Sequence, residues 1–477
     1  MVNTSRDRIV AYASPRSLGG RSIFEPNAIL HSSHVETYKS APKDEKAAVN
    51  KLEKMGFKVE KVSELSIRIS GTAKQFANKM GVKFEKEQAS QMFVPTSEST
   101  MNALQLASEV LEGVAFPQPV EPHGKKKASP PKKKAPPKKS PPKKAAPAGP
   151  SPTPPPLAFY HLEVPHDIAT IMNAGPAHTA GHRGQGVKVA MIDSGFGWAN
   201  HPYFTGKGYS LKVKPPFDVD DSGHGTGESA NLLAVAPKVQ LHGLGMDDSV
   251  ASFQAARNVI RAKIVSNSWG SRLPTDGPFS TWDPYWSLVL AEISLCVQAG
   301  MIVLFSGGNG GMSATASSPD VISVGGVFRD GTNQLFATDY ASSFNSFRFP
   351  GRQVPDVCGL CGTRPGAIYI ALPIPKGCEI DQDLAGGAFP NKDTTKKNDG
   401  WAVFSGTSAA CPMVAGVVAL MLSKTPTLTL AQVRQALEST CRDVTQGVSS
   451  MGDSATAGRD LATGFGLVDA AAAVAAV

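Results

Sequence analysis

Residues 404–416 read FSGTSAACPMVAG, and the apolar run continues to Leu422. Proline lacks a backbone N–H and is tolerated in the first turn of a helix, so Pro412 predicts a helix that begins near Ser408. The run MVAGVVALMLS is apolar on nearly every side, which indicates a helix buried in a core. Gly406 permits close approach to the helix start, where free N–H groups and the helix dipole favour negative charge. The stretch therefore predicts a reachable hydroxyl, that of Ser408, at the N-terminus of a buried helix.

Apolar β-type runs alternate with helical runs from about residue 157 to the last residue. The strand-like runs include VKVAMID, VQLHGL, AKIVSNS, MIVLFS and VISVGG, and the helical runs include SFQAARNVIRA and LVLAEISLCVQAG. Unbroken Val- and Ile-rich strands separated by helices predict an α/β fold with a parallel sheet covered by helices on both faces. In such sheets ligands bind beyond the carboxyl ends of the strands, so we expect the chemistry there.

Composition divides the 477 residues into three parts. In residues 1–123, four β-type runs (RIVAYA, FKVEKV, LSIRIS, VKFEKE) alternate with two amphipathic helical runs, which predicts a small α+β, ferredoxin-like domain of order β-α-β-β-α-β. Residues 124–156 are a Lys/Pro repeat with nothing to bury, and we expect a disordered, solvated linker. Residues 157–477 hold the parallel sheet and are the predicted catalytic domain.

The formal charge of +8 is concentrated in the linker. Ten lysines lie between positions 125 and 144, and the remainder of the chain carries a formal charge of −2. The excess of positive charge therefore belongs to a spacer, and we expect no nucleic-acid partner.

The N-terminus has no apolar run of the length that a secretory signal needs, and no run approaches a membrane span. We expect a cytoplasmic protein with no membrane partner; secretion by another route is the alternative.

Six cysteines in so long a chain do not predict a disulfide scaffold. Cys358, Cys361 and Cys378 would supply three zinc ligands, but no fourth Cys or His follows at a suitable spacing. Cys411, close to Ser408, is interpreted as a small buried apolar residue. Free thiols and no metal are therefore the prediction.

Two further residues complete a set of catalytic candidates. The run VKVAMID ends in Asp193, a carboxylate at the end of a buried strand. His224 lies between two glycines in DSGHGTGE, at a predicted helix start where small neighbours leave its ring accessible. Taken alone, the aspartate fits a helix cap and the histidine a structural role. Together with Ser408 they supply the nucleophile, the base and the orienting carboxylate of a hydrolase.

The blocks MIDSG, GHGTGE and SGTSAACPMVAG resemble the three signature blocks of subtilisin-like serine proteases, in the order of that family, and the resemblance covers the third region. It implies an endopeptidase with Asp193, His224 and Ser408 as its triad, and protein or peptide substrates. Calcium sites are frequent in this family, so calcium is possible, although no ligand loop stands out in the sequence.

Two more segments match the family by position. VSNSWG is similar to the strand that pairs with an extended substrate, which implies that Ser268, Trp269 and Gly270 line the cleft. LFSGGNGG places Asn309 where the family keeps the side-chain amide of its oxyanion hole.

Residue 228 departs from the family pattern, because it is Glu where many relatives carry a small apolar residue. Sedolisins, related acid-active enzymes with a Ser-Glu-Asp triad, also use acidic residues from this helix, and ISGTAKQFANKMGV resembles their propeptides. They carry Asp at the oxyanion position and Glu in place of His, whereas this chain has Asn309 and His224. We interpret the chain as subtilisin chemistry behind a sedolisin-like prodomain. An acid-active sedolisin-like protease and an inactive peptide-binding protein of the same fold are the alternatives.

The resemblance also implies a zymogen in which residues 1–123 assist folding and then block the cleft as an intramolecular inhibitor. The expected tail is EVLEGVAFPQPVEPH, with Phe116 in an apolar pocket. Pro117 disfavours cleavage directly after Phe116. Autoprocessing is therefore expected later, between about Val120 and Leu157, where the linker offers no folded structure. A permanently attached binding domain is the alternative.

Overall fold

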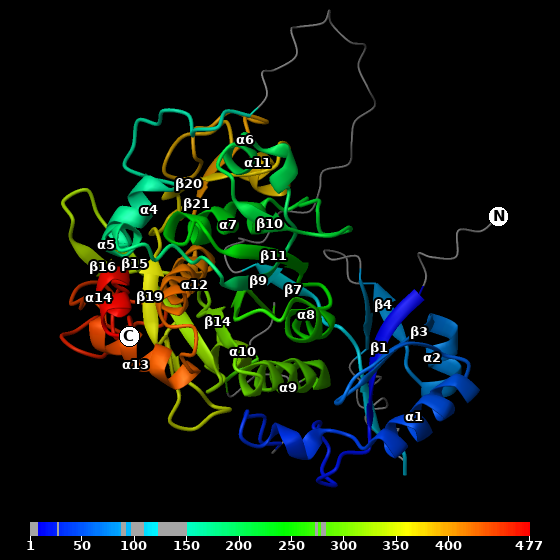
Figure 1. The fold of residues 1–477 in the computed structure, drawn as a ribbon. Helices are drawn as coiled ribbons and strands as arrows, with labels where there is room; N and C mark the ends of the chain where they lie inside the picture. Colours follow the sequence, from blue (N-terminus) through cyan, green and yellow to red (C-terminus); the bar gives the residue numbers. More distant parts are fainter. Residues whose placement is uncertain are drawn as a thin grey trace, which may run out of the picture.

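The chain folds into a smaller N-terminal unit that lies beside a larger unit (Figure 1). The computed structural model describes residues 8–25, 28–86, 92–96, 109–122, 150–271, 275–277 and 283–477. The Lys/Pro segment up to residue 149, for which the sequence predicts a disordered linker, lies outside the described residues.

The larger unit is built on an eight-stranded sheet. Its strands are, in spatial order, β10 (Ser210–Lys212), β11 (Gln240–Gly245), β9 (Lys188–Asp193), β12 (Ile264–Asn267), β14 (Ile302–Ser306), β15 (Val321–Arg329) and β16 (Leu335–Ala337), with β19 (Val357–Leu360) also paired to β15. Within this sheet every pairing is parallel except that of β15 with β16.

Helices cover both faces of this sheet. They are α7 (His224–Val235) and α12 (Thr407–Lys424) on one face, and α8 (Ser249–Ala255) and α9 (Pro284–Gln298) on the other. Along β9, Val189 and Met191 join the core that contains α7 and α12, whereas Ala190 and Ile192 join the core that contains α8 and α9. Side chains of a strand alternate between its faces, so a wholly apolar strand needs a layer on each side. The predicted fold class is confirmed.

Shorter elements complete the larger unit. They are α4 (His166–Ile171), α5 (Gly175–Thr179), η2 (Trp198–Asn200), α6 (Pro202–Thr205), the π-helical η3 (Ala256–Ile260), β13 (Trp269–Ser271), α10 (Ala314–Ser317), β17 (Phe344–Asn345), β18 (Gln353–Val354), α11 (Glu379–Leu384), α13 (Leu430–Thr440) and α14 (Ala470–Ala475). A three-stranded sheet joins β21 (Trp401–Phe404), β20 (Ile370–Pro373) and β8 (Leu162–Glu163).

Helix α12 begins at Thr407, next to the predicted start at Ser408, but Pro412 is its sixth residue. The prediction that Pro412 lies in the first turn was therefore wrong. The missing N–H leaves the carbonyl of Ser408 without its helical donor. The hydroxyl of Ser268 donates to that carbonyl at 3.0 Å, so the proline is accommodated by a bond from the neighbouring strand segment.

Among helices of the described residues, α12 alone has the length and apolar composition of a membrane span. However, 89% of its apolar window is buried inside the protein. A core helix of a globular unit passes the same test, and α12 packs directly against α7 and the main sheet.

The N-terminal unit has a four-stranded antiparallel sheet of order β2-β3-β1-β6. Its elements are β1 (Arg8–Pro15), η1 (Val35–Tyr38), α1 (Pro42–Lys54), β2 (Lys58–Val62), β3 (Ile67–Thr72), α2 (Ala73–Met80) and β6 (Leu111–Ala115). The predicted fourth strand, VKFEKE, was wrong as a member of this sheet. Its residues form β4 (Phe84–Lys86), which pairs instead with β5 (Phe93–Pro95), and the fourth position belongs to β6.

The two faces of the N-terminal sheet pack against different partners. Ile9 and Ala11 of β1 belong to the unit's own core with α1 and α2. Tyr12, on the opposite face, packs against Tyr285 of α9 with ring centroids 6.3 Å apart. Phe116 also lies in the unit's own core, where its ring is 5.3 Å from that of Phe76. The prediction that Phe116 fills a pocket of the cleft is therefore wrong.

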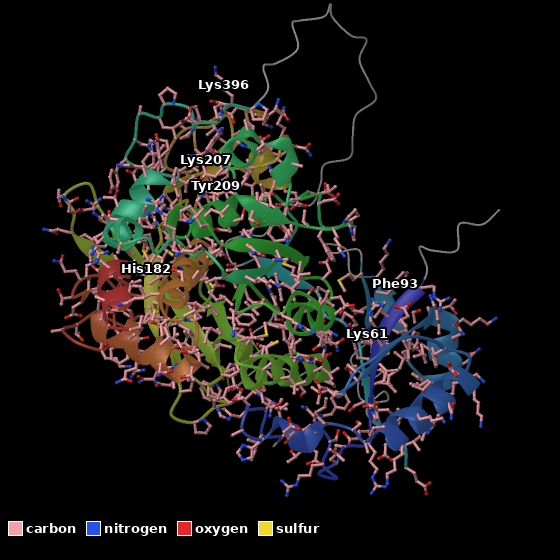
Figure 2. The ribbon with its side chains drawn as sticks, in the orientation of Figure 1. Lys61, Phe93, His182, Lys207, Tyr209 and Lys396 are labelled. Carbon is pink, nitrogen blue, oxygen red and sulfur yellow. The ribbon has the colours of Figure 1, made fainter. Side chains whose placement is uncertain are left out.

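Polar contacts join the two units around α8. Tyr12 donates to Asp248, which N-caps α8, and Arg68 forms an ion pair with the same carboxylate at 3.0 Å. Arg257 of η3 forms an ion pair with Glu64 at 3.0 Å. Lys61, labelled in Figure 2, extends toward this boundary, where burial lowers the pKa of its ammonium group.

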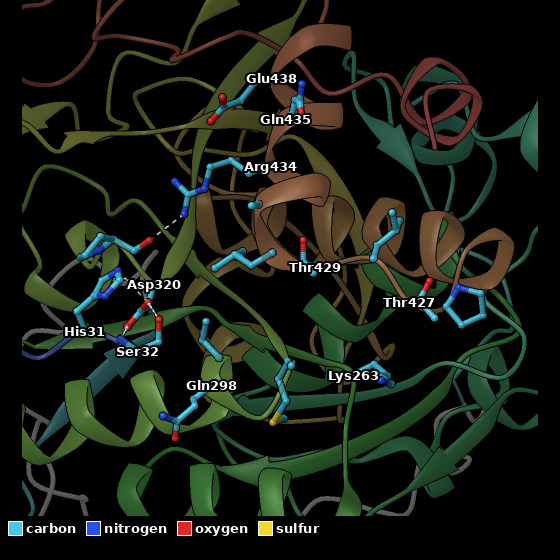
Figure 3. A pocket seen from close by; sticks show the side chains of 18 of the residues that line it. His31, Ser32, Lys263, Gln298, Asp320, Thr427, Thr429, Arg434, Gln435 and Glu438 are labelled. Atoms are coloured by element: carbon cyan, nitrogen blue, oxygen red, sulfur yellow. Dashed lines mark hydrogen bonds and ion pairs between the residues drawn. The ribbon is translucent and has the colours of Figure 1, made fainter. Parts of the chain in front are cut away.

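A second contact lies at the far end of α9. Figure 3 shows His31 and Ser32 of the N-terminal unit against Asp320, at the edge of a cavity of about 900 Å³. The backbone N–H and the hydroxyl of Ser32 donate to Asp320 at 2.7 and 2.6 Å. The hydroxyl of Ser294 in α9 donates to the same buried carboxylate at 2.8 Å. The N-terminal unit is thus held at two separate places on the larger unit.

We expect Gly416→Ala to lower the free energy of unfolding by about 1–3 kcal/mol, because the added methyl overpacks the junction of α7 and α12. A Cβ at position 416 would stand 2.7 Å from Cβ of Val235 and 3.1 Å from the carbonyl oxygen of Leu232. Denaturant unfolding of both variants measures the change. Gly175→Ala is the matched control, because its Cβ would meet no atom within 4 Å. Equal stability of the two variants would contradict the packing argument.

Candidate active site

The carboxyl end of β9 and the first residue of α7 form one hydrogen-bonded pair. Asp193 is the last residue of β9 and His224 the first of α7. Nδ1 of His224 lies 2.7 Å from Oδ1 of Asp193, and the two side chains are 4% and 0% exposed. The backbone N–H of Ser194 donates to the same oxygen at 2.7 Å. The pair fixes the imidazole with Nε2 turned away from Asp193 and available as an acceptor.

Two glycines allow this close approach. Gly223, the N-cap of α7, has a φ of 86°, a left-handed conformation that favours glycine. A Cβ on Gly225 would stand 2.4 Å from the carbonyl oxygen of Gly195 and 2.9 Å from Cβ of Asp193. Any side chain at position 225 would therefore push α7 away from β9 and separate Asp193 from His224.

Asp220 joins the segment that follows β9 to the start of α7. Its buried carboxylate accepts the hydroxyl of Ser194 at 2.8 Å and the backbone N–H of Gly223 at 2.9 Å. It also accepts the backbone N–H and the hydroxyl of Thr226, at 2.9 and 2.7 Å. Burial raises the pKa of Asp220, and the bonds from Thr226 and Ser194 oppose that shift. Asp220 thus takes the N-cap role for α7 that Gly223 cannot perform.

Ser408, the second residue of α12, is joined to the strand segment at Ser268. The hydroxyl of Ser408 donates to the carbonyl of Ser268 at 3.2 Å, and the hydroxyl of Ser268 donates to the carbonyl of Ser408 at 3.0 Å. The start of α12 lies beside α7, since a Cβ on Gly227 would be 2.7 Å from the ring of Phe404. Nε2 of His224 has no hydrogen-bond partner among the described residues, so in this conformation it is not bonded to Ser408.

Asn309 is oriented by the first residue of α12. Its Oδ1 accepts both the backbone N–H and the hydroxyl of Thr407, each at 3.1 Å. Its buried Nδ2 therefore points the other way, and this amide has no partner among the residues that the structure describes. The arrangement presents an N–H donor close to the N-terminus of α12, where backbone N–H groups also lack helical acceptors.

The strand segment beside Ser408 carries a paired peptide. β13 pairs antiparallel with β7 (Val120–Pro122) of the N-terminal unit, in the register Trp269 with Pro122, Gly270 with Glu121, and Ser271 with Val120. Trp269 itself is fully buried and packs edge-on against Phe305, with ring centroids 5.2 Å apart. The backbone of β13, rather than the indole, is therefore what this segment offers to an extended chain.

The electrostatics of the site are governed by buried carboxyl groups. Burial, the largest influence, would lower the pKa of His224, but Asp193, Glu228 and Asp220 together raise it above the usual value of 6.5. Burial raises the pKa of Glu228 from 4.5 to about 7, against the opposing effects of His224 and Asn231. The neighbouring carboxyl groups thus favour the charged form of His224, against the opposing effect of burial.

The cysteines have separate partners. The thiols of Cys358 and Cys361 donate to the carbonyls of Thr463 and Gly406 at 3.2 and 2.8 Å, and Cys378 packs beside Gly223. All six cysteines are free thiols. In the described part of the chain, no group of three or more His, Cys, Asp or Glu side chains is placed to hold a metal ion. The described residues therefore do not fit a zinc site, and no step is derived through a metal.

The structure brings the predicted residues into three contacting groups: Asp193 with His224, Ser408 with Ser268, and Asn309 with the start of α12. Sequence reasoning missed Asp220 and Thr407. An aspartate four residues before a histidine at a helix start was a signal for the first, because α7 has no capping side chain of its own. Thr407 had no comparable signal in the sequence.

The fold and the site define a serine peptidase of the α/β type, and comparison with known proteins gives its family. The model of the family described as "Subtilase family" matches residues 184–466, more than half of the chain. The chain therefore belongs to the subtilase family of serine endopeptidases.

Similar proteins include three that are informative. Subtilisin E of Bacillus subtilis is 30% identical over 302 residues, which cover 59% of this chain and 67% of that protein. A calcium-dependent protease of Nostoc sp. is 28% identical over 345 residues, which cover 61% of this chain and 46% of that protein. Fervidolysin of Fervidobacterium pennivorans, a keratinolytic enzyme related to subtilisin, matches with a TM-score of 0.56 and 17% identity, covering all of this chain and 62% of its own. This last likeness supports the fold alone.

We expect Asp220→Ala to lower the free energy of unfolding by about 3 kcal/mol, because it strands several buried donors. Asp330→Ala is the control. In a surface turn, Asp330 accepts the N–H and hydroxyl of Thr332 and the N–H of Gln334, each within 2.9 Å. Water replaces these bonds, so the loss there should be much smaller than for Asp220→Ala. Chemical denaturation measures both, and similar losses would contradict the role assigned to Asp220.

Proposed function

We propose that this chain cleaves internal peptide bonds through a triad of Asp193, His224 and Ser408. The observation that carries the proposal is the buried bond of 2.7 Å between Nδ1 of His224 and Asp193. It favours the tautomer in which Nε2 bears the lone pair, and it stabilises the imidazolium that forms when Nε2 takes a proton.

The reaction follows the acyl-transfer scheme. As Oγ of Ser408 bonds to the substrate carbonyl carbon, its proton passes to Nε2 of His224. His224 then gives this proton to the leaving amine as the C–N bond breaks, which leaves an ester at Ser408. Water, deprotonated by His224, attacks the ester and releases the acid, and the proton returns to Oγ.

Asn309 and the backbone N–H of Ser408 are proposed as the oxyanion hole. Nδ2 of Asn309 is buried and its Oδ1 is held by Thr407, so the donor is oriented before substrate arrives. Donors fixed in advance stabilise the tetrahedral oxyanion without reorganisation during the reaction.

Ser268, Trp269 and Gly270 are proposed to bind substrate through the backbone of β13. The antiparallel pairing of β13 with β7 supports this, because it shows the segment accepting an extended peptide. Main-chain pairing is largely independent of side chains, so it suits an enzyme that acts on protein or peptide substrates.

The N-terminal unit is proposed as an intramolecular inhibitor that is removed by autoprocessing. β7 lies on the edge where a substrate would pair, and the Asp248 and Asp320 contacts hold the rest of the unit in place. β7 ends at Pro122, whose partner Trp269 directly follows Ser268 in the chain. The carbonyl of Ser268 is 3.2 Å from Oγ of Ser408, which favours the bond after His123 for cleavage.

We expect Ser408→Ala and His224→Ala each to lower kcat by about a million-fold, because nucleophile and base act as one unit. Asp193→Ala should cost less. Ser423→Ala is the control: this serine lies in the same helix, and its hydroxyl donates to the carbonyl of Leu420, at 2.7 Å. Peptide hydrolysis measures turnover, and a fluorophosphonate probe should label wild type at Ser408. A folded, processed protein that takes up no probe would instead support the inactive peptide-binding alternative.

Autoprocessing should release a fragment that ends at His123. Intact mass spectrometry of purified wild type should show two chains, and Ser408→Ala should remain a single chain. Gly124→Pro should block the cut at this bond, because proline has no N–H and constrains the backbone, whereas Gly124→Ala should permit it. A wild type that stays uncut while fully active would rule out the zymogen and favour a permanently attached domain.

A further inference from the structure

Glu228 is a buried carboxyl group that the triad mechanism leaves unused. It follows His224 by four residues in α7, so both side chains project from one face of the helix. The Glu228 side chain is 1% exposed, and its Oε1 lies 3.8 Å from Nε2 of His224. Neither of these two buried atoms has a hydrogen-bond partner among the described residues. Facing polar atoms that both lack a partner are uncommon, because burial without a bond is costly.

The orientation of this carboxyl group is fixed from its other side. Nδ2 of Asn231 donates to Oε2 of Glu228 at 2.8 Å, one turn further along α7. The bond directs Oε1 toward the imidazole. Asn231 is itself fully buried, so the carboxyl has no route to solvent through this contact.

The charged and titratable groups around the pair come from several elements. Asp193 of β9 and Asp220, before α7, act on His224, and Asp193 also acts on Glu228. Cys361, directly after β19, and Cys411 of α12 face Glu228. Burial raises the pKa of Cys411 to about 12 and also raises that of Cys361, so both thiols stay neutral at working pH. His224 is therefore the group whose charge responds to Glu228.

We propose that Glu228 is a positioning residue for His224: its carboxyl and Nε2 of His224, at 3.8 Å too far apart for a direct hydrogen bond, hold one proton between them, and this pair sets the pH range in which Nε2 accepts the proton of Ser408. The inference rests on the proposed catalytic role of His224. In one form the carboxyl is protonated and the imidazole neutral; in the other the proton has moved to Nε2 and the carboxyl is charged. Only the neutral imidazole retains the lone pair that the reaction needs.

The sign of the effect follows from charge. An ionised Glu228 stabilises the imidazolium and so raises the pKa of His224. Burial brings the pKa of Glu228 to about 7, into the range where imidazole titrates, so the pair loses its protons in two coupled steps. Removing the carboxyl should lower the pKa of His224 and leave a single step.

The kinetic test compares kcat/KM against pH for wild type, Glu228→Gln and Asp381→Asn. We expect Glu228→Gln to move the acid limb down by about one pH unit and to replace two ionisations by one. Asp381→Asn is the control, because Asp381 is also fully buried, with one oxygen that lacks a partner among the described residues. Its other oxygen accepts N–H groups of Gly377 and Asn398 at 2.7 and 2.9 Å. Its profile should match wild type. An unshifted acid limb in Glu228→Gln would overturn the proposal.

A second measurement needs no turnover. NMR titration of the His224 imidazole in full-length Ser408→Ala should show two steps, and adding Glu228→Gln should leave one step at lower pH. Glu228→Asp keeps the carboxyl at a greater distance and should retain both steps, closer together. Superimposable titrations of Ser408→Ala and its Glu228→Gln derivative would overturn the shared proton. A wild type without peptidase activity would refute the proposed triad, while this titration would still decide the role of Glu228.

Discussion

The hydrogen bond between Asp193 and His224 depends on the absence of a side chain at position 225. β9 and α7 approach so closely that a Cβ there would stand 2.4 Å from the carbonyl oxygen of Gly195. Everything else at the site is arranged around this contact. Asp220 clamps the turn before α7 to Ser194, and α12 packs along α7 with Gly416 at their junction. The geometry of the proposed catalytic site is thus set by the backbone spacing of a strand and two buried helices.

Much of this arrangement could be predicted from sequence, because strong local signals and tertiary structure agree. The apolar runs predicted β9, β12, β14 and β15, and the signature blocks placed Asp193 and His224 at an element end and start. The parallel sheet follows from strands that are apolar at every position. The position of Pro412 within its helix was predicted wrongly. The preference of proline for the first turn holds for a helix without outside hydrogen-bond donors, whereas here Ser268 donates to the carbonyl that Pro412 leaves without a donor.

Other features depend on contacts between distant segments, which periodicity does not reveal. Phe116 was expected in the cleft, but it completes an aromatic cluster with Phe76 and Phe84. VKFEKE has the alternation of a strand and was expected in the N-terminal sheet. Its strand β4 pairs with β5 instead, and β6 takes the place beside β1. The sequence drew attention to Glu228 only as a departure from a family pattern. That its carboxyl group faces Nε2 of His224 could not be predicted from sequence, because it depends on the side-chain conformation of Glu228. The hydrogen bond from Asn231 fixes that conformation.

In the proposed zymogen, the pairing of β7 with β13 has a consequence for how inhibition depends on concentration. While the chain is continuous, β7 and β13 belong to one molecule, so their pairing does not depend on the protein concentration. Once the proposed autoprocessing has cut the bond beyond β7, the same contacts hold two separate molecules, and occupancy of β13 follows ordinary mass action. Dilution or degradation of the released unit then favours the open enzyme without any change in either surface. Activity would therefore appear first where the protein is scarce and other proteases are present, and last where it is concentrated.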